Sequence, residues 1–128
     1  MVLLYSLLYP GAEIELGSTK IKVIETPCHT LGHISFVVDG TMDGLNPPVL
    51  FPGDTLFVGG CGRFFEGTAA QMLKNMDQYR ELSPDTLVCP AHEYTESNFK
   101  FLASVDPELQ KSYEEIKARR AAGNYSSR

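Results

Sequence analysis

The sequence changes character near its middle, from short β-rich runs to segments with helical periodicity. In the first half, residues 13–16, 20–25, 33–39 and 49–51 are rich in β-branched and aromatic residues and are separated by turn residues. Residues 86–89 form one more short apolar run. Polar segments that contain His, Asp and Gly follow several of these runs directly. This order predicts an α/β layered domain whose functional residues lie on loops at strand ends.

A first helix is predicted over residues 69–82. Thr68 and Gln71 fit a capping box at its start, in which each side chain bonds a free backbone amide of the first turn. The apolar residues that recur at helical spacing and predict its buried face are Met72, Leu73, Met76, Tyr79 and Leu82.

Two further helices are predicted after it. Thr95 is a candidate cap, and Asp106-Pro107 is a strong helix start, because Pro suits the first helical position. Gly123 supplies a stop. The apolar residues expected to face inward are Phe99, Phe101 and Leu102 in the second helix and Leu109, Tyr113 and Ile116 in the third.

Composition narrows the class of protein. The 128 residues suffice for one domain with a usable core, and 43% hydrophobic with 21% charged residues is typical of a soluble globular chain. The net charge of -5, without a lysine or arginine cluster, argues against a nucleic-acid partner. Residues 1–9 are apolar but too short to span a bilayer and lack the marks of a secretory signal, so an edge strand is expected there and no membrane partner. Three cysteines without a Cys-x-x-Cys pair favour a reducing compartment, the cytoplasm or the mitochondrion.

Two of the three histidines lie in the segment Thr-Pro-Cys-His-Thr-Leu-Gly-His, residues 26–33. Pro27 and Gly32 disfavour a helix, so His29 is predicted on a loop between two strands. A loop histidine whose ring is held by neighbouring backbone is a common metal ligand. Taken alone, His29 and His33 are more simply explained as residues that pack or cap a strand end.

Asp54 directly follows the apolar run at residues 49–51. Proteins of the α/β class place functional carboxylates at such strand ends, and a carboxylate can bridge two cations because it has two oxygens to share. The alternative for Asp54 is an Asx-type turn that closes the strand.

Residues 59–67 contain four glycines, which would let backbone approach a ligand closely. Arg63 within this segment could pair with a substrate carboxylate, or could be an exposed arginine on a flexible loop. Cys61 has no basic neighbour in sequence to lower its pKa and is interpreted as structural. His92 follows the run at residues 86–89 and so lies on another strand-end loop. Tyr94 could bond a ligand or cover the core, which is the commoner role of a tyrosine.

The order of these motifs resembles glyoxalase II, the hydroxyacylglutathione hydrolase family of the metallo-β-lactamase superfamily. Thr-Pro-x-His-Thr-x-Gly-His, Gly-Asp-Thr-Leu-Phe, Gly-Cys-Gly-Arg with Phe-Glu-Gly-Thr, and His-Glu-Tyr-Thr follow one another within residues 20–105. The resemblance implies a partial αββα fold, namely its second half, a mixed β-sheet with covering helices. Residues 1–105 would be the second half of the metallo-β-lactamase-like domain. Residues 106–128 would begin the helical region that binds glutathione.

The resemblance also implies roles for individual residues. His29 would bind a first divalent cation and His92 a second, and Asp54 would be the catalytic carboxylate that bridges both. Zinc is the expected metal, although iron and manganese use the same ligands. Arg63, Phe65 and Tyr94 would contact glutathione, with Phe65 at a position where a tyrosine often occurs, and His33 would not be a metal ligand.

The implied reaction is the hydrolysis of S-(2-hydroxyacyl)glutathione, chiefly S-D-lactoylglutathione, to the 2-hydroxy acid and glutathione. A hydroxide held between the two cations would attack the thioester carbonyl.

One departure from the family is large. The family's His-x-His-x-Asp-His motif, which supplies two further ligands to each metal, does not occur in the sequence. The chain is therefore expected to be a fragment that lacks this half, to bind metal weakly, to be inactive alone, and to self-associate through an exposed sheet edge. Two alternatives stay open: an enzyme like the mononuclear iron persulfide dioxygenases, and a degenerate module without activity.

Overall fold

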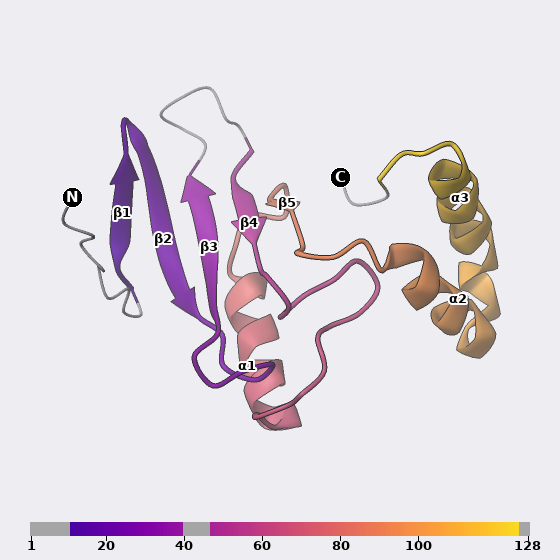
Figure 1. Cartoon of the computed structure of the whole chain (residues 1–128), viewed down its shortest axis with the longest axis horizontal. Coiled ribbons are helices and arrows are strands. Elements are labelled where there is room, and N and C mark those ends of the chain that lie inside the picture. Colours follow the sequence, from indigo (N-terminus) through magenta and orange to yellow (C-terminus); the bar gives the residue numbers. More distant parts are fainter. Residues whose placement is uncertain (1–10, 40–46, 126–128) are drawn as a thin grey trace, which may run out of the picture.

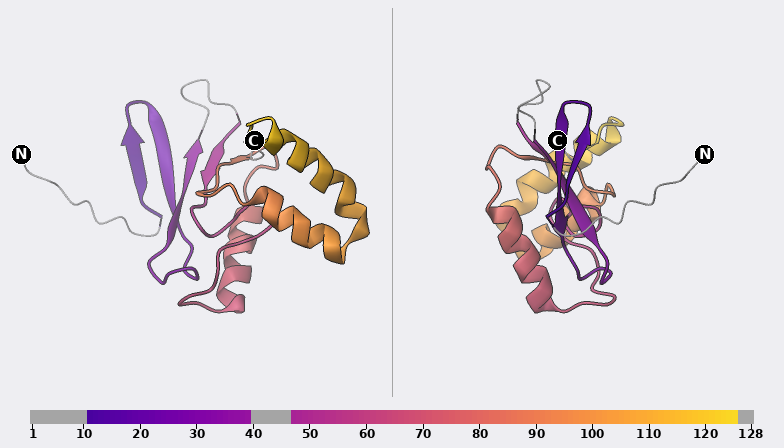
Figure 2. Two further views of the ribbon diagram at one scale, coloured as in Figure 1. Left: turned by 45° about the vertical axis from the view of Figure 1, so that its right-hand side comes forward. Right: turned by 90° about the vertical axis from the view of Figure 1, so that its left-hand side faces the viewer.

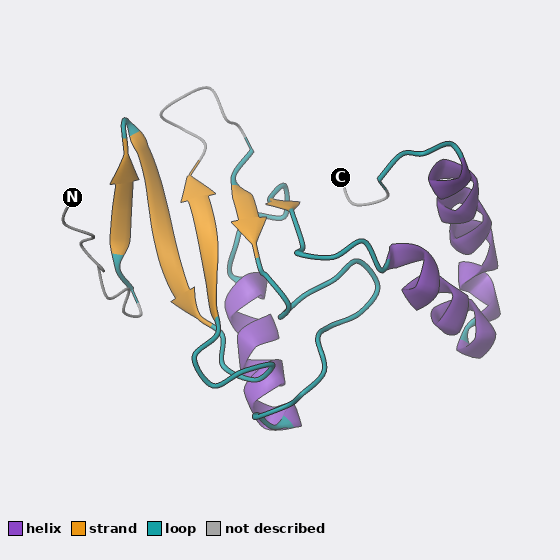
Figure 3. Ribbon diagram, viewed as in Figure 1, coloured by secondary structure: helices purple, strands orange, loops and turns teal. Residues whose placement is uncertain are grey.

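The computed structural model describes residues 11–39 and 47–125, in which four strands come before the first helix and a fifth strand follows it, as the sequence predicts (Figure 3). The predicted edge strand at residues 1–9 lies outside the described residues. The strands are β1 (Glu13–Leu16), β2 (Thr19–Glu25), β3 (Ile34–Asp39), β4 (Val49–Phe51) and β5 (Leu87–Val88). Each agrees with a predicted run to within a residue at either end.

The five described strands form one sheet in the order of the sequence, β1-β2-β3-β4-β5 (Figure 1). Neighbours are antiparallel except β4 and β5, which are parallel. Consequently β2, β4 and β5 run in the same direction and their carboxyl ends lie at the same edge of the sheet. The loops that follow these three strands meet at that edge.

The helices of the described part are α1 (Ala69–Arg80), α2 (Thr95–Val105) and α3 (Gln110–Ala121). The predicted capping box of α1 is confirmed, since the Thr68 hydroxyl accepts a bond from the Gln71 amide and the Gln71 side chain accepts one from the Thr68 amide. Gly123 follows α3 with a φ of 78°, as expected for a glycine stop.

The starts of the other two helices differ from the prediction. Thr95 is the first residue of α2 rather than its cap, and Tyr94 at the cap position makes no side-chain capping bond. A 3-10 turn, η1 (Pro107–Leu109), precedes α3. The Asp106 carboxylate caps that turn by accepting a bond from the Glu108 amide, so the predicted Asp-Pro start is used by η1.

The core lies between α1 and one face of the sheet (Figure 2). Ile24, Val37 and Leu50 form its centre and are covered by four partly buried side chains, Leu56, Tyr79, Leu82 and Val88. Two residues predicted to face inward do not. Leu73 is 57% exposed on α1 and Phe101 is 66% exposed on α2.

The opposite face of the sheet is also apolar. Side chains alternate along a strand, and the strand register therefore places one set of residues on this face. No helix of the described residues lies over its β1–β3 part in the views of Figures 1 and 2. Val23 is buried on this face, whereas the other members are partly or fully exposed: Ile14, Leu16, Ile21, Phe36, Val38, Val49, Phe51 and Leu87.

The helices α2 and α3 pack against each other beyond β5 (Figure 1). Phe99 and Leu102 of α2 contact the segment after β4 at Gly59, which joins the helix pair to the site edge of the sheet. None of the helices in the described ranges is long and apolar enough to cross a membrane.

Candidate metal centre

The loops that follow β2, β4 and β5 bring together the three residues that the sequence singles out as metal ligands. His29 lies on the first loop, Asp54 on the second and His92 on the third. The His29 Nε2 atom is 3.5 Å from Asp54 Oδ2, and the His92 Nε2 atom is 3.2 Å from Asp54 Oδ1. The carboxylate of Asp54 therefore stands between two imidazole rings.

The orientation of the His29 ring is set by the glycine-rich loop. Its Nδ1 atom lies 2.9 Å from the carbonyl oxygen of Arg63, which can only accept a hydrogen bond. The Nδ1 atom therefore carries a proton that it donates to this carbonyl, and Nε2 is the ring atom that faces Asp54. A histidine held in this way by a backbone carbonyl is prepared to bind a cation.

Asp54 has close contacts at both its backbone amide and its backbone carbonyl. Its amide donates to His33 Nε2 over 3.2 Å, and its carbonyl group lies directly beneath Gly62. The polypeptide bends at Gly53, where φ is 55° and a β-carbon would meet His33. The lack of a β-carbon at Gly53 and Gly62 therefore makes room for other parts of the protein, namely the His33 ring and the Asp54 carbonyl.

His33 lies beside the site, in contact with Asp54, and is not one of the candidate ligands. Its Nδ1 atom lies 2.9 Å from the Thr26 hydroxyl and 3.1 Å from the Thr55 hydroxyl. Burial lowers the pKa of His33, which the nearby Asp54 carboxylate raises in part. His33 is thus a neutral, half-buried residue that positions Asp54.

The sequence did not reveal how strongly residues 62–67 hold the His29 loop. Glu66 accepts a hydrogen bond from the Leu31 amide over 2.6 Å, and the Gly67 amide donates to the Cys28 carbonyl over 2.9 Å. A β-carbon at Gly67 would overlap the backbone of Cys28. Glu66 stands within the Phe-Glu-Gly-Thr motif, but the sequence does not show which backbone amide it meets.

Aromatic side chains border the two histidines. The rings of His29 and Phe65 lie 5.0 Å apart edge to face, and those of His92 and Tyr94 are stacked at 4.9 Å. The Arg63 guanidinium lies 5.4 Å from the centre of the Phe65 ring. Phe65 is 63% exposed and Tyr94 is 48% exposed, so both rings are open to solvent and the core alternative for Tyr94 does not apply.

His29, Asp54 and His92 fit a centre in which each cation also has ligands from outside this set. Within the described ranges, no three His, Cys, Asp or Glu side chains converge on a single point. Each gap between Asp54 and a histidine is instead close to the roughly 3.4 Å that separates two ligands of a tetrahedral cation with bonds of about 2.1 Å. In addition, Asp54 Oδ1 is buried without a hydrogen-bond partner, which is costly for a carboxylate oxygen unless a cation meets it.

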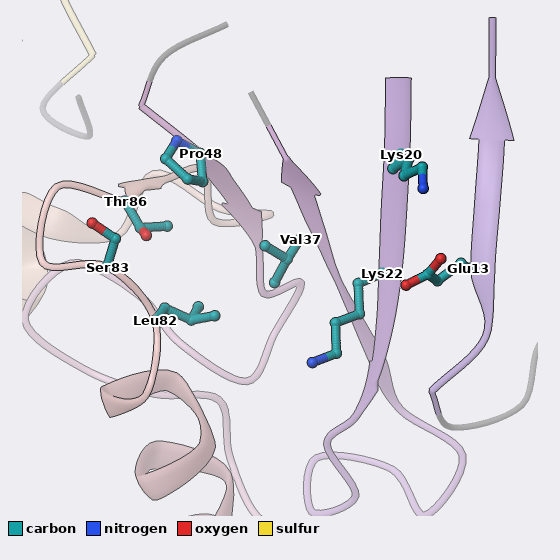
Figure 4. Close-up of a pocket in the computed structure, with 8 residues that line it drawn as sticks. All are labelled: Glu13, Lys20, Lys22, Val37, Pro48, Leu82, Ser83 and Thr86. Carbon is teal, nitrogen blue, oxygen red and sulfur yellow. The ribbon is translucent and has the colours of Figure 1, made fainter. Parts of the chain in front are cut away.

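A hollow with a volume of about 300 Å³ lies elsewhere on the sheet. Its lining includes Lys20, Pro48 and Thr86, which lie at or just before the amino ends of β2, β4 and β5, at the edge opposite the candidate centre. Figure 4 shows the Glu13 carboxylate pointing toward Lys20 and Lys22, so charges of both signs line it. None of the three candidate ligands belongs to this hollow.

Comparison of the sequence with known proteins agrees with the geometry. No family model matches the chain. The chain is 41% identical over 123 residues to the hydroxyacylglutathione hydrolase of Serratia proteamaculans, covering 94% of this chain and 46% of that protein. It is 50% identical over 97 residues to that of Photorhabdus laumondii, covering 76% of this chain and 36% of that protein.

Over most of its length, the chain matches one part of the hydroxyacylglutathione hydrolases. It spans somewhat less than half the length of the curated relatives that it matches. This agrees with the expectation from the sequence that the chain is a part of a larger enzyme of this family.

Solved structures that resemble this chain belong to the metallo-β-lactamase superfamily. A metallo-β-lactamase from Staphylococcus aureus superimposes with a TM-score of 0.64 at 33% identity, over 72% of this chain and 28% of that chain. ETHE1 from Myxococcus xanthus gives 0.58 at 32% identity, over 68% and 36%. TTHA1623, solved in a di-iron-bound form, gives 0.52 at 28% identity, over 71% and 42%. The expected partial α/β metallo-β-lactamase fold is confirmed.

Proposed function

We propose that this chain supplies His29, Asp54 and His92 to a two-cation centre that hydrolyses S-(2-hydroxyacyl)glutathione, with S-D-lactoylglutathione as the chief substrate. The products would be the 2-hydroxy acid and glutathione. The observation that carries the proposal is the Asp54 carboxylate between two imidazole nitrogens, with one buried oxygen that no hydrogen bond satisfies. The names of the curated relatives favour this reaction over persulfide oxidation.

In this proposal each side chain has a distinct task. His29 would hold one cation and His92 the other, and the Asp54 carboxylate, which lies 3.5 Å and 3.2 Å from the two rings, would contribute to both sites. Divalent cations bound there would polarise the thioester carbonyl and lower the pKa of water, and zinc, iron and manganese all accept this donor set. The Arg63 carbonyl accepts the Nδ1 proton of His29, so Nε2 would be the atom that binds a cation.

The exposed side chains beside the centre would bind the glutathione part of the substrate. Arg63 provides a planar cation for a carboxylate, and glutathione carries two carboxylates. Phe65 and Tyr94 flank the two histidines and provide ring faces and one phenol hydroxyl. We place the start of the helical glutathione-binding region at residues 106–128, and the enzyme in the cytoplasm or the mitochondrion.

The proposal treats the chain as one part of the active site. His29 with Asp54, and His92 with Asp54, provide two protein ligands for each cation, whereas catalytic zinc sites usually have three. The chain alone should therefore bind metal weakly and hydrolyse the thioester negligibly. A His-x-His-x-Asp-His segment of the kind that the family carries would complete both cation sites.

Metal binding by the purified chain tests the assignment of the ligands. Co²⁺ titration followed by its visible absorption should give weak binding that Asp54→Asn and His92→Ala each weaken by about tenfold or more. Asp85→Asn, which alters an exposed carboxylate on the loop after α1, is the matched control and should leave the affinity unchanged. Equal affinity in all four proteins would refute the assignment.

Reconstitution tests the reaction. The chain should be co-expressed with the part of the Serratia proteamaculans relative that it does not cover, and assayed with S-D-lactoylglutathione. Hydrolysis that depends on both parts and is lost in Asp54→Asn would support the proposal. A stable, metal-loaded complex without thioester hydrolysis would instead favour the degenerate module.

A further inference from the structure

A chain of buried hydroxyl groups connects helix α1 to His33. The Tyr79 hydroxyl on α1 lies 2.6 Å from the Ser35 hydroxyl on β3. The Ser35 hydroxyl lies 2.9 Å from the Thr26 hydroxyl, and this lies 2.9 Å from His33 Nδ1. Thr26 and Ser35 are completely buried. The network therefore begins in the core beneath α1 and ends on the residue that holds Asp54.

The hydrogen bonds of the network have only one consistent direction at His33. Its Nε2 atom accepts from the Asp54 amide, so the single proton of the neutral ring is on Nδ1. That Nδ1–H group donates to the Thr26 hydroxyl, with the Thr55 hydroxyl as a second acceptor. The Thr26 hydroxyl can then donate to Ser35, and Ser35 to the Pro52 carbonyl 3.4 Å away.

Tyr79 completes the network. If Ser35 donates to Pro52, its oxygen must accept from its other neighbours, and the Tyr79 hydroxyl is the donor that remains. Burial raises the pKa of Tyr79, and its bonds with Ser35, Thr55 and Thr26 offset this in part, so the phenol keeps its proton near neutral pH. An apolar residue at position 79 would leave Ser35 with one acceptor site unsatisfied.

We propose that Tyr79, Ser35 and Thr26 are positioning residues that hold His33 in its Nδ1-protonated tautomer, so that His33 fixes the Asp54 peptide and aims its carboxylate between His29 and His92. The inference deepens the proposed function, since it assumes that the position of Asp54 matters for the cations. The tautomer itself belongs to the protein without metal and can be measured there.

The geometry around Asp54 shows why its amide needs such support. The Asp54 carbonyl, which belongs to the next peptide group, lies against Gly62. Among the described residues, no backbone hydrogen bond joins the two. The neighbouring Gly53 has a φ in the left-handed region. Glycine adopts many other backbone conformations equally well, so contacts with the surrounding residues must fix this turn. The His33 tautomer with the proton on Nε2 would point a donor at the Asp54 amide and remove the bond that orders this turn.

The first measurement is the tautomer of His33 in the metal-free chain, from long-range ¹H–¹⁵N spectra of the histidine rings. We expect His33 to show an unprotonated Nε2 and a protonated Nδ1. A protonated Nε2 in the neutral ring would overturn the proposal, whatever the chain does with metal or substrate.

The second measurement is hydrogen exchange at the Asp54 amide in four variants. Thr26→Val removes the hydroxyl that accepts from His33, and Thr26→Ser retains it. Tyr79→Phe removes only the far end of the network, and Tyr113→Phe removes a tyrosine hydroxyl on α3 as the matched control. Relative to the Val23 amide, which bonds the Ala12 carbonyl just before β1, the Asp54 amide should exchange about tenfold faster in Thr26→Val.

Tyr79→Phe should accelerate Asp54 exchange by roughly threefold, because the network loses one bond and keeps the others. Thr26→Ser and Tyr113→Phe should match the parent chain. Unchanged relative exchange in both Thr26→Val and Tyr79→Phe would overturn the proposal. A chain with the expected tautomer and exchange that binds no Co²⁺ would support the positioning network and refute the proposed metal function, so the two failures are distinguishable.

Discussion

The Gly62 residue lies so close to the carbonyl oxygen of Asp54 that a β-carbon on Gly62 would overlap that oxygen. The same β-carbon would lie 3.1 Å from Nδ1 of His29, at the atom that bonds the Arg63 carbonyl. Gly62 is buried and its φ is not in the left-handed region, so its requirement for glycine is one of space. The glycine-rich loop thus fits tightly against two candidate ligands at once.

Gly62→Ala should therefore damage both the fold and the centre. The added methyl group must displace either the Asp54 backbone or the His29 ring, and overpacking of this kind costs about 1–3 kcal/mol of unfolding free energy. Urea unfolding would measure the loss, and Co²⁺ titration should show binding weakened by about tenfold. Gly32→Ala is the matched control, because a β-carbon there meets nothing within 4 Å. Equal behaviour of the two variants would contradict the close packing at Gly62.

The three cysteines should differ in their reaction with thiol reagents. Cys28 is completely buried and burial raises its thiol pKa, whereas Cys61 and Cys89 are exposed. Alkylation depends on access and on the thiolate, so Cys28 in the folded chain should react at least about tenfold more slowly than the other two. Mass spectrometry of peptides after timed iodoacetamide treatment would measure the rates. All three should react alike in 8 M urea, and similar rates in the folded chain would show that Cys28 is accessible.

The capping box of α1 should contribute measurably to stability. Thr68→Ala removes the hydroxyl that accepts from the Gln71 amide and should lower the unfolding free energy by about 1 kcal/mol. Ser97→Ala removes an exposed hydroxyl inside α2 and should change it by less than about 0.5 kcal/mol. Thermal and urea denaturation of both variants would test this. A loss in Thr68→Ala no larger than that in Ser97→Ala would mean that α1 does not depend on its cap.

The strands and the location of the site could be predicted from the sequence for a physical reason. β-branched runs bounded by turn residues are local patterns, and the structure reproduces them from β1 to β5. The grouping of His29, Asp54 and His92 also follows once β2, β4 and β5 point the same way, since each residue follows one of these strands. Their roles as ligands come from the family resemblance and stay a proposal.

What the sequence could not provide are contacts between distant segments. The Glu66 side chain meets the Leu31 amide, and the Tyr79 hydroxyl meets Ser35, across 35 and 44 positions of the chain. Tyr79 was predicted only as one member of an apolar helix face, because periodicity reports burial and is silent about a hydroxyl group. Phe101 is predicted to face inward but is exposed, because its burial depends on how α2 packs against α3, and the sequence does not show that packing.

The apolar face of the sheet that α1 does not cover should cause the isolated chain to self-associate. It carries Leu16, Phe51 and Leu87, which are 71%, 43% and 41% exposed, and β1 is an edge strand of the sheet that the described residues form. A contiguous apolar patch beside an open strand edge favours association between copies. Leu16→Lys places a charge on both features, and sedimentation velocity should show a smaller associated fraction than in the parent chain. Leu73→Lys is the matched control, because Leu73 is 57% exposed on α1, away from this face. A parent chain that stays monomeric at about 100 μM, well above the roughly micromolar Kd of many specific contacts, would contradict the expectation.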